Sequence, residues 1–239
     1  MMLLWRQLEA EMRRVAGACL LASGVLALLA TATAHVTRSL LPGATMSALL
    51  PTGTRVYADA NYAYVLEVVW TLAAVLPALV LSGDVADHVR AVTLAFPIGT
   101  GRLILLRAAV GLAWPLAWTA GGLGLADALG MPFVFTRDLA LLLPESAAMF
   151  ALALAAVEAS GQVGVGAGAA VGAMVFGAGL PGDPLPQPSD YWELFCARGH
   201  PLGPLLWDNR LALAAISVLL LVAAAWACAY RRGHGAYAP

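Results

Sequence analysis

Long apolar runs separated by shorter polar segments dominate the chain. Six such runs lie at about 16–36, 63–81, 103–125, 139–157, 162–180 and 211–230. A helix rises about 1.5 Å per residue, so a run of about 20 residues crosses the roughly 30 Å hydrocarbon core of a bilayer. The pattern therefore predicts an all-α, polytopic membrane protein with six transmembrane helices.

The first 15 residues have a different pattern, with one apolar helical face and charges on most of the other. The apolar face carries Leu4, Leu8, Met12 and Val15. Glu9 and Arg13 are four residues apart, a spacing that favours an ion pair on a helix. We expect residues 1–15 to form an N-terminal interfacial amphipathic helix that lies along the membrane. A frayed tail is the alternative.

Residues 16–36 also have features of a secretory signal, because arginines precede the run and Ala32, Thr33 and Ala34 imitate a cleavage site. The apolar run is longer than a usual signal core of about 7 to 15 residues. We therefore expect it to remain as the first span.

The longest polar segment, 181–210, is rich in proline and in aromatic residues. Aromatic side chains that alternate with polar ones favour short helices at a membrane interface, so we expect short extracytoplasmic helices before the last span. Residues 37–62 are expected to form another external loop. The whole chain, 1–239, is then a single transmembrane domain.

Composition agrees with a membrane protein and excludes several functions. Of the 239 residues, 61% are hydrophobic and 11% are charged, and the mean hydropathy is +0.81, whereas soluble domains carry about 25% charged residues. The basic residues are all arginine. A phosphate-binding P-loop needs a lysine, so we expect no ATPase site in this chain and no enzymatic activity of its own. The net charge of -1 and the scattered basic residues argue against a nucleic-acid partner.

Arginines are distributed unequally between the two sides that six spans would create. One side carries Arg6, Arg13, Arg14, Arg90, Arg102, Arg107, Arg231 and Arg232. The other side carries Arg38, Arg55, Arg137, Arg198 and Arg210. Because positive residues favour the cytoplasmic side, we expect a multi-pass protein of the cell membrane with both termini in the cytoplasm.

Catalytic and metal-binding patterns are missing from the sequence. The four histidines lie far apart without metal-ligand spacing, and the three cysteines suggest no disulfide framework. No cofactor or metal is therefore expected. Glu67 and Glu145 are candidate pathway acids, because a carboxylate inside a span is a candidate functional group. The alternative is that each lies near the outer end of its helix and reaches the interface.

Glycines are dense in the run 162–180. Gly168 and Gly172 form a small-xxx-small step, which lets helices approach closely. We expect this step to pack tightly against another helix.

The segment 82–102, between the second and third runs, holds much of the chain's interior charge. Its charged and junction residues are Asp84, Asp87, His88, Arg90, Arg102 and, just beyond it, Arg107. Unpaired charges are costly in hydrocarbon, at about 2.5 to 3.5 kcal/mol each at mid-depth. The segment is therefore predicted to lie at a membrane face, and the alternative is an ordinary solvated loop.

This junction resembles the cytoplasmic signature of type-2 ABC transporter permeases. Asp84, Pro97 and Arg107 have the spacing of that family's acidic residue, proline and basic residue. The match is one of pattern, since His88-Val89 replaces the usual small-Thr pair and Arg107 replaces the usual lysine. The N-terminal helix, the large outer segment before the last span and an Asn209-Arg210 pair extend the resemblance over the chain.

The resemblance implies a membrane-spanning permease subunit of an ABC exporter. Such a subunit pairs with a second permease copy, identical or homologous, and binds two separate ABC ATPase subunits through the segment 82–102. The residues implied in coupling are Asp84, Asp87, His88, Arg90, Pro97, Arg102 and Arg107. A non-transporting membrane anchor or scaffold subunit and a membrane-embedded enzyme are the alternatives, and the substrate is left open.

Overall fold

The computed structural model describes residues 6, 9–13, 15–17, 19, 60–83, 100–128, 135–176 and 206–234. Within these residues all regular structure is helical, so the predicted all-α class is confirmed for this part of the chain. The long helices are α2 (Ala60–Leu81), α4 (Thr100–Ala128), α5 (Phe135–Ser160), α6 (Val163–Phe176) and α7 (Leu206–His234). Near the N-terminus, 9–13 and 15–17 are also helical.

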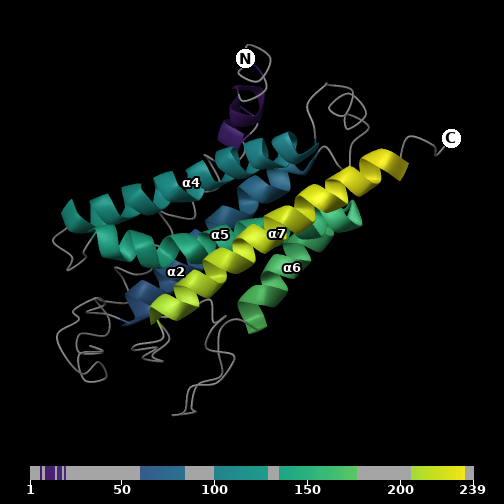
Figure 1. The fold of residues 1–239 in the computed structure, drawn as a ribbon. Coiled ribbons are helices and arrows are strands. Elements are labelled where there is room, and N and C mark those ends of the chain that lie inside the picture. Colours follow the sequence, from purple (N-terminus) through teal and green to yellow (C-terminus); the bar gives the residue numbers. More distant parts are fainter. Residues whose placement is uncertain are drawn as a thin grey trace.

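Helix α5 lies at the centre of the described bundle. It contacts α2, α4, α6 and α7, and its contact with α7 is the most extensive. Figure 1 shows α4, α5 and α7 running alongside one another, with α6 inclined to α7 and the short N-terminal helix standing across the direction of α4. The chain therefore surrounds one apolar helix with segments that are distant in sequence.

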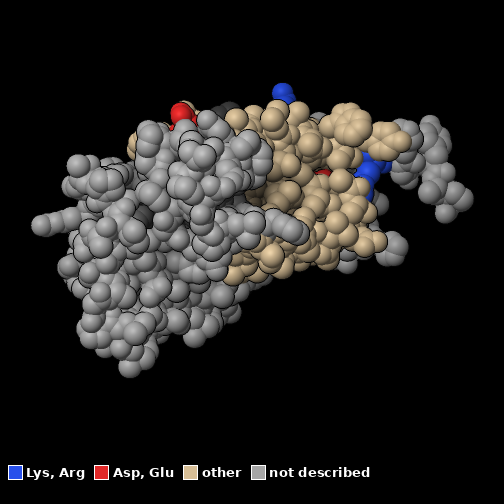
Figure 2. Space-filling view, turned by 90° about the horizontal axis from the view of Figure 1, so that it is seen from below, with Lys and Arg blue, Asp and Glu red and all other residues tan. Residues whose placement is uncertain are grey.

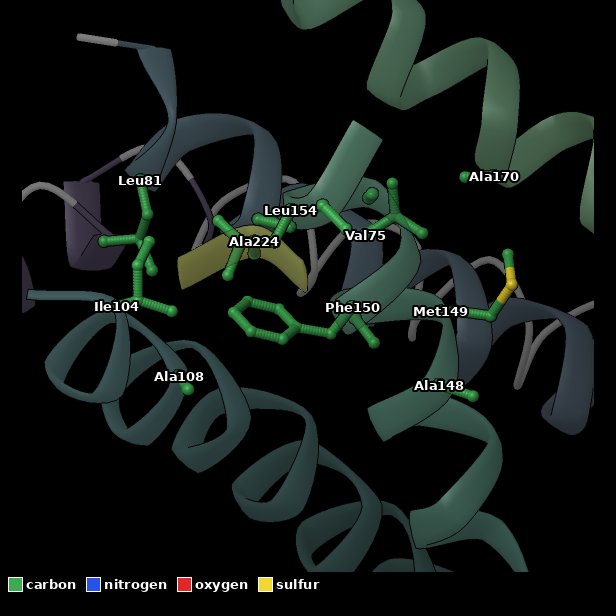
Figure 3. Close-up of a cluster of buried hydrophobic side chains, with 14 of the residues drawn as sticks. Val75, Leu81, Ile104, Ala108, Ala148, Met149, Phe150, Leu154, Ala170 and Ala224 are labelled. Carbon is green, nitrogen blue, oxygen red and sulfur yellow. The ribbon is translucent and has the colours of Figure 1, made fainter. Parts of the chain in front are cut away.

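The hydrophobic core forms where α2, α4 and α7 meet α5. Phe150 is fully buried, and in Figure 3 its ring lies between Ala108 of α4 and Ala224 of α7. Small residues leave room for this ring, since a methyl group added at Gly111 of α4 would overlap it. Close packing between α4 and α5 thus depends on one large side chain facing a glycine.

A glycine ends α5 and turns the chain into α6. Gly161 has a φ of 78°, a left-handed conformation that residues with a Cβ rarely adopt, and its N–H donates to the Val157 carbonyl at 2.8 Å. The Ser160 hydroxyl donates to the Ala156 carbonyl at 2.7 Å. These bonds satisfy carbonyls at the helix end, so α6 begins only two residues after Gly161.

Helix α6 packs on α5 through Gly166 and Ala170 rather than through the predicted Gly168–Gly172 step. A Cβ at Gly166 would lie 2.9 Å from the Ala153 carbonyl oxygen, and Ala170 is buried. At Gly168 and Gly172 a Cβ would meet nothing within 4 Å. A small-xxx-small step does make the close approach, but it lies two residues earlier.

Two described stretches, Leu142–Ser160 and Trp207–Arg231, are long and apolar enough to cross a membrane. Shorter apolar helices lie at Thr71–Leu81 and Val163–Val175. Much of α7 is exposed despite its composition, and Trp226 is 70% exposed. In Figure 2 the described surface is largely tan, with few blue or red atoms. The described part of the chain thus has a surface that is low in charge, with exposed apolar side chains on α7, which is consistent with a membrane-associated protein.

Several predicted segments lie outside the described residues. These are residues 20–36 of the first predicted span, 84–99 of the junction and 177–205, which covers most of the predicted outer segment. The other predicted apolar runs fall within α2, α4, α5, α6 and α7, apart from Gln162 and residues 177–180 of the run 162–180.

We predict that Gly166→Ala destabilises the fold while Gly168→Ala does not. The methyl group at 166 must displace backbone of α5, which costs about 1 to 3 kcal/mol. At 168 the methyl group enters open space, and alanine in place of a helical glycine is worth up to about 1 kcal/mol. Unfolding of the purified variants in detergent measures both changes. Equal stability of the two variants would contradict this packing of α6.

Candidate functional site

The predicted functional residues fall into three groups in the structure. Asp84, Asp87, His88, Arg90 and Pro97 lie outside the described residues. Glu67 belongs to α2, but its side chain is not among those that the structure describes. Arg102 is exposed near the beginning of α4, whereas Arg107 and Glu145 are buried. Arg107 of α4 and Glu145 of α5 belong to two separate polar sites, each of which includes a carboxylate of α5.

The first site joins three segments around Arg107, and we call it the Arg107 cluster (Glu11, Arg107 and Glu158). The Arg107 Nη1 donates to Glu158 Oε1 of α5 at 3.2 Å, and its Nη2 lies 3.8 Å from Glu11 Oε1 of the N-terminal helix. All three side chains are at least 96% buried. The guanidinium fork therefore bridges two carboxylates with different nitrogens, as its planar geometry allows.

Arg231 of α7 joins the same end of α5. Its Nη2 donates to the Ala159 carbonyl at 2.5 Å, which is one of the carbonyls left without a partner at the end of a helix. The guanidinium also lies against Gly161, where a Cβ would be 3.1 Å from Arg231 Cζ. A larger residue at 161 would thus displace this contact as well as strain the backbone.

The second site is the ion pair between Glu145 of α5 and Arg210 of α7. Both side chains are almost fully buried, and the Arg210 Nη2 contacts Glu145 Oε1 directly. The neighbouring Asn209 and Ser146 side chains are buried too. Glu145 is therefore neutralised by a cation from another helix and lies within a small polar group inside the bundle.

The two sites lie at different levels and on different sides of α5. Glu145 and Glu158 are thirteen residues apart, which corresponds to about 20 Å along the helix and about 140° around it. This rotation lets Glu145 face α7 while Glu158 faces α4. Since α7 contacts α5 through Arg210 and then through Arg231, the two helices run parallel.

The contacts at both sites are ionic and structural in kind. A paired, desolvated carboxylate and guanidinium hold helices in register, and removing one partner leaves a buried charge. Among the described residues, no group of three or more His, Cys, Asp or Glu side chains could hold a metal ion. Buried ion pairs of this kind can hold the helices in one register.

Sequence reasoning missed three members of these sites. Glu158 lies one residue past the end of the predicted run 139–157. The sequence marks Arg210 as an outer arginine and as part of the Asn209-Arg210 pair, without a partner on another helix. Glu11 falls on the charged face of the predicted N-terminal helix. A usable signal was the charge balance, because each acid near a span end had an arginine near the same end of another span. The exposed Glu9–Arg13 pair, at 2.6 Å, confirms the predicted i,i+4 contact.

Comparisons with protein-family models, with curated proteins and with solved structures gave no match to this chain.

We predict that Glu145→Gln destabilises the protein more than the double replacement Glu145→Leu with Arg210→Met. The single change leaves the Arg210 guanidinium buried without its carboxylate, at a cost of about 3 to 5 kcal/mol, whereas an apolar pair is close to neutral or stabilising. Unfolding in detergent micelles measures both.

Glu9→Gln is the matched control for this comparison. It removes an exposed ion pair, which is worth about 0 to 1 kcal/mol. If Glu145→Gln were as stable as this control, the buried pair would not be holding α7 against α5.

Proposed function

We propose that this chain is the membrane-spanning permease subunit of an ATP-driven ABC exporter, working as a dimer with separate ATPase subunits. The observation that carries the proposal is the position of the Arg107 cluster. The segment 84–99, which is outside the described residues, connects Gly83, just after the end of α2, to Thr100, seven residues before Arg107 on α4. A force applied to that segment reaches α2 and α4 directly, and Arg107 passes it to α5.

The membrane part of the proposal is six spans with the Arg107 cluster at the cytoplasmic face. The exposed side of α7 supports it, because Trp207 and Trp226 are nineteen residues apart, or about 28 Å along the helix, which is close to the hydrocarbon thickness. Trp226 also stacks on Tyr230 at 5.8 Å, and both are exposed. Exposed aromatic rings at this separation suit the two interfaces of a bilayer.

The same two interfaces would account for the positions of the buried ion pairs along the bundle. Arg210 follows Trp207 by three residues and Arg231 follows Tyr230 by one. The two polar sites would then lie near the two membrane boundaries, with apolar packing around Phe150 between them. Glu145 would accordingly be a boundary residue that ties α7 to α5, which favours a structural role over a place in the middle of a pathway.

A scaffold subunit is the second candidate, since it would need the same bundle. Charge at the junction separates the two candidates, because a scaffold does not require Asp84, Asp87, His88 and Arg90 to meet an ATPase. The permease proposal also accounts for the absence of a P-loop lysine in this sequence, because ATP hydrolysis then takes place in another chain.

We predict that reversing Asp87 and Arg90 together (Asp87→Arg with Arg90→Asp) weakens copurification of an ATPase and its stimulation by substrate. Exposed ion pairs contribute about 0 to 1 kcal/mol each, so two reversals are needed to see the loss. The control is Arg137→Asp with Asp138→Arg in the first turn of α5, at the opposite end of the bundle. Undiminished copurification with a folded junction variant, or equal loss in the control, would count against coupling through this segment.

We predict for the topology that a cysteine at Ser189 is labelled from outside intact cells and that one at Gly235 is not. The motive is the arginine distribution together with the position of Glu11 and Arg231, which both lie at the end of the bundle that holds the Arg107 cluster. The experiment uses a membrane-impermeant maleimide before and after permeabilisation, in a background lacking the native cysteines. Labelling of Gly235→Cys alone would invert the proposed orientation.

A further inference from the structure

Helix α4 runs antiparallel to α7, which brings an arginine of each helix to the same end of the bundle. Arg107, near the beginning of α4, meets Glu158, near the end of α5. Because α7 runs parallel to α5, α4 begins at the end of the bundle where α7 finishes. Arg102 of α4 and Arg231 of α7 therefore belong to the same end.

These two arginines also lie at the same level along the bundle. In Figure 3 the Phe150 ring lies between Ala108 of α4 and Ala224 of α7, which gives the two helices a common reference. Arg102 comes six residues before Ala108, or about 9 Å along α4, and Arg231 comes seven residues after Ala224, or about 10 Å along α7. Arg102 is exposed and Arg231 is partly exposed, so both reach the surface at this level.

Apolar side chains are exposed directly beside the two arginines. Leu105, one turn after Arg102 on the same face of α4, is 68% exposed. Trp226, five residues before Arg231 on α7, is exposed and stacks on the exposed Tyr230. On both helices the surface thus changes from a guanidinium to large apolar side chains within about one turn. A surface that meets only water does not require this change at a common level, whereas the boundary between lipid headgroups and acyl chains does.

The described surface has the opposite charge at the other end of α7. Asp208 is exposed there, whereas Arg210 is buried against Glu145. In Figure 2 a red group lies to the left, the side on which α7 begins in Figure 1, and blue atoms lie farther to the right, toward its end. Among the described residues of α4 and α7, exposed arginine is thus confined to one end, which attracts an anionic surface.

We propose that this end of the bundle binds the headgroups of anionic phospholipids through Arg102 and Arg231. The proposal rests on the membrane-spanning part of the function proposed above, and it adds which lipids the chain prefers and where they bind. A guanidinium can donate to two phosphate oxygens at once, while the stem of the arginine lies along apolar surface. Leu105 and Trp226 then contact the acyl chains. Because Arg231 also donates to the Ala159 carbonyl, its guanidinium is held in place at this level.

Competition between two lipids tests this site. The full-length protein, purified in dodecyl maltoside, is incubated with equal amounts of phosphatidylglycerol and phosphatidylcholine that have the same acyl chains, and bound lipid is counted by native mass spectrometry. The wild type should retain phosphatidylglycerol in preference, and high salt should weaken this preference. Arg102→Gln should lower the ratio of bound phosphatidylglycerol to phosphatidylcholine about fivefold, which corresponds to about 1 kcal/mol for one arginine at an anionic surface. Arg102→Lys keeps the charge and should retain most of the preference.

Arg137→Gln, in the first turn of α5, is the matched control, because it makes the same change at the opposite end of the bundle. It should leave the lipid ratio unchanged. Arg231→Gln separates lipid binding from a structural role. A residue that only supports the end of α5 would lower stability without changing the lipid ratio, whereas a lipid contact at Arg231 lowers the ratio by a similar factor to Arg102→Gln. An unchanged ratio in a folded Arg231→Gln variant would contradict the two-arginine site.

Failure of this site and failure of the membrane proposal give different results. If an alkaline wash releases the chain from vesicles of the same two lipids, the membrane-spanning proposal fails and the lipid site fails with it. If the chain stays in the vesicles but binds both lipids equally, or loses the preference equally in Arg102→Gln and Arg137→Gln, the lipid site alone is wrong. If Arg102→Gln lowers ATPase copurification while the lipid ratio is intact, this end is a protein-docking surface instead.

Discussion

The structure depends on α5 providing an acceptor for arginines of the neighbouring helices, of which Arg107 and Arg210 are buried and Arg231 is partly exposed. Glu145 accepts Arg210, Glu158 accepts Arg107, and the Ala159 carbonyl accepts Arg231. An uncompensated charge inside an apolar bundle is strongly unfavourable, so the buried Arg107 and Arg210 restrict how α4 and α7 can lie on α5. Apolar packing alone would permit helices to slide or rotate, because surfaces rich in alanine and leucine resemble one another at many registers. The ion pairs favour one register of the helices. In that register the Phe150 ring of α5 packs against Gly111 of α4.

These contacts divide the bundle into a polar level, an apolar level and a second polar level. The division follows from the sequence of α5, where thirteen residues separate Glu145 from Glu158 and the buried residues between them are mainly alanine, leucine, methionine and phenylalanine. The same spacing turns the two carboxylates toward different neighbours. One helix can therefore organise both α7 and α4 without bringing the two arginines into repulsive contact.

The helices were predictable from the sequence, while their contacts were not. The run 139–157 lies within α5, which extends from Phe135 to Ser160, because backbone hydrogen bonding continues into polar residues where a hydropathy pattern stops. The partners of Glu145 and Arg107 come from helices far away in sequence, and a helical pattern shows which residues share a face but not what that face meets. The same limit explains Glu11. Its charge assigned it to the polar side, whereas in the structure it is buried beside an arginine from α4.

The glycines of α6 show how the choice among similar motifs is made. Gly164, Gly166, Gly168 and Gly172 all allow close approach, so the sequence offers several equivalent steps. Gly161 resolves the choice, because its left-handed turn fixes the direction in which α6 leaves α5 and thereby the face that returns to it. Gly166 then lies against Ala153 and Val157, Ala170 is buried one turn later, and Arg231 contacts the turn from the α7 side. The polar contact at the end of α5 thus determines the apolar packing of α6, as the other two arginine contacts determine that of α4 and α7.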